Sequence, residues 1–134
     1  MLKKIPLAKP YFSKDEFKEI QKVIDSGWVA GNGPTGQRLS LEMNEKYGFQ
    51  YSLPIANCTA GLHLSLICLG IKEGDEVLVS DYTFPATGHS VLYTGATPVF
   101  VDSLADTYNF DIGDARKKIT PRTKAIICVH TFGN

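Results

Sequence analysis

Short apolar runs alternate with stretches of helical periodicity across the second half of the chain, and this alternation constrains the fold more than any other feature. Four apolar runs have the length and composition of buried strands: residues 51–56, 77–79, 99–101 and 125–129. Helical patterns lie between them, over about 59–69, 85–93 and 111–119. The alternation predicts an α/β fold, a mostly parallel sheet covered by helices and joined by right-handed crossovers.

The first part of the chain has a different pattern. Ser13 and Glu16 have the spacing of a capping box, and apolar residues then recur at helical spacing over 17–24. The segment 28–36, WVAGNGPTG, is rich in glycine and holds a proline, which predicts an irregular loop. Apolar residues at helical spacing over 39–48 predict a second helix.

Composition argues against several classes of partner. The 14 Lys and Arg residues balance the 14 Asp and Glu residues, so no overall field would draw the protein to nucleic acid. No apolar segment approaches the length of a membrane span or a signal peptide, and we expect a cytoplasmic protein with no membrane partner. Cys58, Cys68 and Cys128 form an odd set without a CxxC pair, and we expect reduced thiols that serve in packing.

The turn NCTAG, residues 57–61, joins a predicted strand to a predicted helix through small and polar residues. Ligands of open α/β sheets collect at the carboxyl ends of strands, where a helix N-terminus offers N–H groups and a partial positive charge. Small residues such as Ala60 and Gly61 would let an anion approach the backbone, and the Thr59 hydroxyl would add a hydrogen bond. A plain N-cap such as Thr, followed by a tightly packed helix, explains the same residues. Under either interpretation we expect the apolar residues of this helix in the core: Leu62, Leu64, Leu66, Ile67 and Leu69.

A second polar turn, SDYTFPATGHS, follows the predicted strand 77–79 and places one aromatic ring at the same edge of the sheet. Phe84 offers a flat apolar surface to a planar ring, or it packs over the sheet edge as an ordinary core aromatic. Two such turns at one edge predict a ligand site there.

Other residue groups carry weaker signals. Cys128 and His130 alternate on a predicted strand, but a zinc site needs three or four ligands, so we expect a structural role and no metal. Asp81 and Asp102 follow strands and either hydrogen-bond in the cleft or stay solvated. Cys58 lacks an evident base that would make it a nucleophile, and a packing role fits it better.

The chain resembles the N-terminal part of the DegT/DnrJ/EryC1/StrS family in five ordered segments: SGWVAGNGPTG, NCTAGLHLSLICLGIKEGDEVLVSDYTFPAT, VLYTGATPVFVD, DTYNFD and ITPRTKAIICVHTFGN. That family comprises sugar-nucleotide aminotransferases that use pyridoxal 5′-phosphate (PLP) on a type I aminotransferase fold. The resemblance implies that residues 1–36 form an N-terminal helix and a substrate-side loop. Residues 37–134 would be the first part of the PLP-binding large domain, incomplete at the C-terminus.

The resemblance also implies roles for individual residues. The backbone and side chain around Thr59 and Ala60 would bind the cofactor phosphate, and Phe84 matches the aromatic residue that stacks on the pyridine ring. The family's Schiff-base Lys and the Asp that pairs with the pyridine nitrogen are expected beyond Asn134. We therefore assign no catalytic residue in this chain, and we expect the 134 residues alone to be inactive.

By resemblance, the full enzyme moves an amino group from glutamate to a nucleotide-linked keto-sugar in surface polysaccharide biosynthesis, as a homodimer. Two alternatives stay open: a PLP- or PMP-dependent deoxysugar dehydratase of the same family, and a non-catalytic fragment that binds phosphate.

Overall fold

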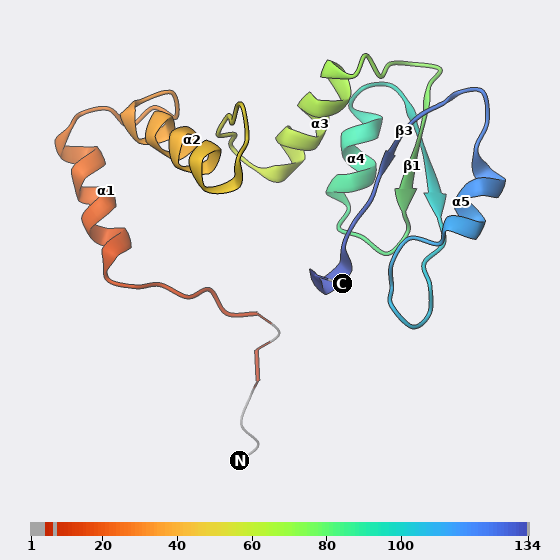
Figure 1. Ribbon diagram of the computed structural model, residues 1–134, viewed down its shortest axis with the longest axis horizontal. Coiled ribbons are helices and arrows are strands. Elements are labelled where there is room, and N and C mark those ends of the chain that lie inside the picture. The colour runs from red at the N-terminus through yellow and green to blue at the C-terminus, as the bar shows by residue number, and fades with distance from the viewer. Residues whose placement is uncertain (1–4, 7, 134) are drawn as a thin grey trace. The chain divides into compact units, whose positions relative to one another are not determined.

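The computed structural model describes residues 5, 6 and 8–133 and divides the chain into two compact units, residues 1–54 and 55–134. The first unit holds two helices, α1 (Asp15–Asp25) and α2 (Pro34–Tyr47) (Figure 1). The second unit holds α3 (Cys58–Cys68), β1 (Glu76–Ser80), α4 (Ala86–Leu92), β2 (Thr97–Val101), α5 (Ile112–Lys118), β3 (Thr123–Ile127) and a short 3-10 helix, η1 (Thr131–Gly133).

The first unit forms one half of the predicted capping box, with Lys14 at the N-cap of α1, and corrects one helix boundary. The backbone N–H and the hydroxyl of Ser13 donate to the Glu16 carboxylate at 3.0 and 2.8 Å, and the N–H lowers the pKa of that carboxyl. α2 begins at Pro34, so the predicted loop 28–36 ends three residues early. Proline suits the first turn of a helix because the N–H that it lacks would have no partner there.

Three parallel strands form the sheet, in the order β2-β1-β3. Glu76 lies opposite Thr97 on one side of β1, and Val77 lies opposite Ala125 on the other. The prediction of a strand over 51–56 is wrong: in the described part of the chain this run pairs with no strand. A strand requires a hydrogen-bonding neighbour, and the run 51–56 pairs with neither β2 nor β3, the two edge strands of the sheet.

Alternate residues of β1 face opposite layers of the second unit. α3 and α4 cover one face of the sheet and α5 covers the other (Figure 1). Val77 and Val79 pack with Leu66, Val91 and other residues on the first face, and Leu78 packs with residues of α5 and of the segment before it on the second. The apolar run of β1 is therefore buried on both faces, as expected for a parallel sheet.

Two packing predictions are wrong. α3 buries only Leu66 of the five apolar residues expected in the core (Leu62, Leu64, Leu66, Ile67 and Leu69), because a helix lying on a sheet buries one stripe of its surface. All three cysteines are exposed. Cys58 and Cys68 are the terminal residues of α3, and Cys128 follows the last residue of the edge strand β3.

The ending of β3 at Ile127 also corrects the placement of Cys128 and His130 on a strand, so strand alternation does not align their side chains. Among the described residues, no group of three or more His, Cys, Asp or Glu is arranged to hold a metal ion. None of the helices described is both long and apolar enough to cross a bilayer.

Candidate functional site

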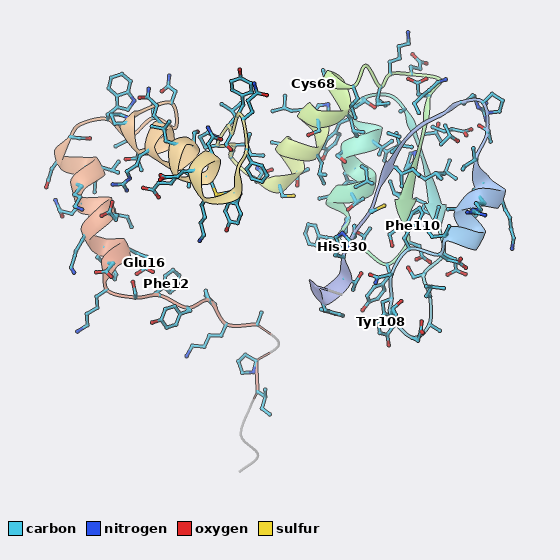
Figure 2. The ribbon with its side chains drawn as sticks, in the orientation of Figure 1. Phe12, Glu16, Cys68, Tyr108, Phe110 and His130 are labelled. Carbon is cyan, nitrogen blue, oxygen red and sulfur yellow. The ribbon has the colours of Figure 1, made fainter. Side chains whose placement is uncertain are left out.

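The carboxyl ends of β1 and β2 lead to opposite faces of the sheet. The segment 81–85 connects β1 to α4 on one face, and the segment 102–111 connects β2 to α5 on the other. Neighbouring strands whose connections diverge in this way mark the point where open α/β sheets bind ligands. Figure 2 shows Tyr108 and His130 at this end of the sheet.

The N-terminus of α3 is capped by Asn57. Its Oδ1 accepts the Ala60 N–H at 2.9 Å, and its carbonyl accepts the Gly61 N–H at 3.2 Å. The plain-cap alternative named Thr as the cap, and the structure gives that role to Asn57. The amides of Cys58 and Thr59 lie in the first turn and have no protein acceptor among the described residues, so they remain available to an outside group.

A hollow of about 430 Å³ opens at this turn, and its walls are Asn57, Thr59, Ala60, His63 and Tyr93. The His63 ring lies edge-on to the Tyr93 ring, with centroids 5.6 Å apart. A Cβ added at Gly61 would meet the end of the flexible Ile55 side chain, which would have to shift. The turn offers backbone N–H donors, the small side chains of Thr59 and Ala60, and the imidazole of His63, and these groups suit a compact anion.

Phe84 lines a second hollow, of about 490 Å³, formed by residues 81–85 and 129–132. Its side chain is 77% exposed, so the ring does not pack over the sheet edge as the ordinary core alternative required. An exposed ring beside a hollow can cover one face of a planar ligand.

The three predicted cofactor contacts thus fall in two hollows of the second unit. Thr59 and Ala60 share one, and Phe84 lines the other. Each hollow lies at the start of a helix, and α3 and α4 lie side by side and run against the direction of β1 (Figure 1). Their N-termini therefore lie toward the carboxyl end of the sheet, and the cofactor role of the three residues stays a prediction.

Sequence reasoning missed Ser103 at this site. Its hydroxyl donates to Asp81 Oδ1 at 2.7 Å across the ends of β1 and β2. Asp81 therefore forms a hydrogen bond, as the first of the two alternatives for this carboxylate predicted. Asp102 Oδ1 accepts the Ser103 N–H at 2.8 Å. The one signal in the sequence was the position of Ser103 just after a predicted strand.

The model of the DegT/DnrJ/EryC1/StrS aminotransferase family matches residues 10–134. The chain belongs to this family. It is 40% identical to GDP-perosamine synthase of Escherichia coli O157:H7 over 133 residues, which are 99% of this chain and 36% of that protein. It is 38% identical to the spore coat polysaccharide biosynthesis protein SpsC of Bacillus subtilis (strain 168) over 129 residues, 96% of this chain and 33% of that one.

A solved structure gives the same answer for the fold. The PMP form of Spr1654 from Streptococcus pneumoniae superposes with a TM-score of 0.86 at 33% identity, over 92% of this chain and 31% of that one. A PLP form of the same protein also matches. The predicted fold, the N-terminal part of a PLP-dependent aminotransferase, is confirmed. The chain spans about a third of the length of the family relatives that it matches.

Proposed function

We propose that this chain is the N-terminal portion of a PLP-dependent aminotransferase that moves an amino group from glutamate to a nucleotide-linked keto-sugar for surface polysaccharide. The observation that carries the proposal is the turn at the start of α3, where the Cys58 and Thr59 amides have no protein acceptor among the described residues and Thr59 and Ala60 line a hollow. The family membership and the names of the two relatives support the substrate class. We also propose a cytoplasmic homodimer.

The α3 turn would hold the cofactor phosphate. The amides of Cys58 and Thr59 would donate to phosphate oxygens, the Thr59 hydroxyl would add a third donor, and the positive end of the helix dipole would favour the anion. Ala60 has only a methyl group, so the phosphate can approach the backbone. When bound, PLP supplies an electron sink for bond breaking at the amino-bearing carbon.

Phe84 would cover one face of the pyridine ring. Its exposed ring lies on the 81–85 turn, and a stacked contact would orient the ring and exclude water from that face. None of the described residues is assigned a proton transfer, since the family's Lys and Asp match no position of this chain. Amino transfer is favoured over the dehydratase alternative because the family description names aminotransferases.

The substitution Ala60→Val tests the phosphate assignment. The added methyl groups would narrow the approach to the α3 amides, and we expect binding of pyridoxamine 5′-phosphate (PMP) to weaken by about tenfold or more, with little change in thermal stability. Equilibrium dialysis of the full chain against PMP measures this. PMP is the suitable probe because it has no aldehyde that could react with surface lysines.

Two controls complete that experiment. Ala105→Val makes the same change on an exposed loop and should leave PMP binding unchanged. Inorganic phosphate should compete with PMP for the wild-type chain. Unaltered affinity in Ala60→Val, or no PMP binding by the wild-type chain, would contradict the proposed function.

A further inference from the structure

The segment 102–111, which follows β2, contacts the 81–85 turn, which follows β1, through a polar link. Ser103 Oγ donates to Asp81 Oδ1 at 2.7 Å. The fully buried Ser80, the last residue of β1, places its own hydroxyl 3.4 Å from Ser103 Oγ. One serine side chain therefore joins the ends of two neighbouring strands at the point where their connections diverge.

An aromatic contact joins the same two segments. The rings of Tyr82 and Tyr108 have centroids 5.2 Å apart and planes inclined by 31°. Tyr108 has a φ of 58°, a left-handed backbone conformation that costs residues other than glycine some energy. Its N–H donates to the Leu104 carbonyl at 2.8 Å, and its own carbonyl accepts from the Thr131 hydroxyl at 3.3 Å.

The base of the 102–111 segment is anchored independently of the 81–85 turn. The Asp102 N–H donates to Asp114 Oδ2 at 2.8 Å, and Lys118 Nζ donates to the same oxygen at 2.6 Å. These two donors lower the pKa of the Asp114 carboxyl. Ser103 also forms an antiparallel bridge with the buried Phe110. Ser103 thus stands on an anchored segment. Its hydroxyl is one of the contacts that tie the 81–85 turn to the end of β2; the Asp81 N–H, which donates to the Val101 carbonyl at 3.0 Å, is another.

We propose that Ser103 is a positioning residue: through its hydrogen bond to Asp81 it holds the 81–85 turn, and with it the Phe84 ring, in place beside the hollow. Phe84 itself has a 77% exposed side chain, so packing does not fix its ring. Two other side-chain hydrogen bonds of the turn, between the hydroxyls of Thr83 and Thr87 at 2.8 Å and from Ser80 Oγ to the Tyr82 carbonyl at 3.4 Å, tie it to α4 and β1 and not to the 102–111 segment. The consequence for cofactor binding rests on the proposed function.

The order of the turn tests this directly. In Ser103→Ala, the NMR order parameters of the Tyr82 and Thr83 amides should fall from the rigid range near 0.85 to below about 0.6. Ser103→Thr keeps the hydroxyl and should restore them. Asp81→Ala should match Ser103→Ala, and the double variant should fall no further, because both changes remove one interaction.

Ser52→Ala is the matched control. Ser52 Oγ donates to Asn44 Oδ1 at 2.6 Å in the first unit, so the same change deletes the same kind of bond elsewhere. The order parameters of Tyr82 and Thr83 should not respond to it. Unchanged order parameters in Ser103→Ala would overturn the proposal, whatever happens to ligand binding.

PMP binding separates the two proposals. We expect Ser103→Ala to weaken PMP binding about three- to tenfold and Ser103→Thr to restore it. A looser turn with unaltered PMP affinity would overturn the positioning role. If the wild-type chain failed to bind PMP, the proposed function would fall, while the order parameters would still decide whether Ser103 holds the turn.

Discussion

The two ends of the three-stranded sheet differ in how their polar groups are satisfied. At the amino end, Glu76 is 6% exposed and its carboxylate accepts from Thr120 Oγ1 at 2.6 Å and pairs with Arg122 at 2.5 Å. At the carboxyl end, the Phe84 ring is 77% exposed and the first amides of α3 have no protein acceptor among the described residues. The amino end of the sheet therefore contributes to the stability of the fold, whereas the carboxyl end has groups that are open to a ligand.

The largest effect on stability is expected for Leu78→Ala, because Leu78 is fully buried in β1, the central strand of the sheet. Removal of a buried leucine side chain typically lowers the free energy of unfolding by about 2–5 kcal/mol. Urea denaturation followed by circular dichroism measures the loss. Leu92→Ala is the matched control, since Leu92 is 55% exposed, and a loss as large as that of Leu78→Ala would mean that the core has been misplaced.

The amino end should make stability depend on pH. The Thr120 hydroxyl, and after it Arg122, lower the pKa of Glu76 from its ordinary value of 4.5. A lowered pKa in the folded state means that the stabilisation is present above pH 4.5 and is lost as the pH falls through the folded-state value. Glu76→Gln should be less stable at neutral pH and lose less stability on acidification.

Urea midpoints measured from neutral pH down to below 4.5 test that expectation. Glu73→Gln changes an exposed carboxylate in the turn before β1 and should leave the neutral-pH midpoint unaltered. If the urea midpoints of wild type and Glu76→Gln fell by the same amount as the pH was lowered, Glu76 would not be the source of the pH dependence.

At the carboxyl end, Asn57 separates helix stability from ligand binding. Asn57→Ala removes the cap of α3 and should lower the free energy of unfolding by about 1 kcal/mol. Asn57→Asp keeps the capping oxygen and should retain most of that stability, but its negative charge would repel a phosphate in the hollow. Thermal melting and PMP dialysis on both variants check this; equal PMP affinity in wild type and Asn57→Asp would argue against an anion at this turn.

The smallest effect on stability is expected for Phe84→Ala, because an exposed ring contributes little to folding. The free energy of unfolding should change by no more than about 0.5 kcal/mol. PMP affinity should nonetheless fall about three- to tenfold, the size of an aromatic stacking contact. Phe12→Ala, at a ring that is 71% exposed in the first unit, should change neither quantity.

Local patterns predicted the elements of the second unit well. The apolar run 77–79 became β1 with one residue added at each end, and Asp111 caps α5 by accepting the Gly113 N–H at 2.7 Å. The run 51–56 failed as a strand because strand formation depends on a partner elsewhere in the chain. Cys58 and Cys68 failed as core residues because burial depends on which stripe of a helix meets the sheet, and Cys128 failed because it follows the edge strand β3.

The sequence by itself determined the family, the alternation of strands and helices, and the small-residue turn at the start of α3, because periodicity and capping depend on residues within a few positions of one another. Only the tertiary structure decided that Ser103 meets Asp81. That contact joins residues 22 positions apart. Such a meeting is set by strand order and by the faces to which the connections lead, neither of which is encoded in any single segment.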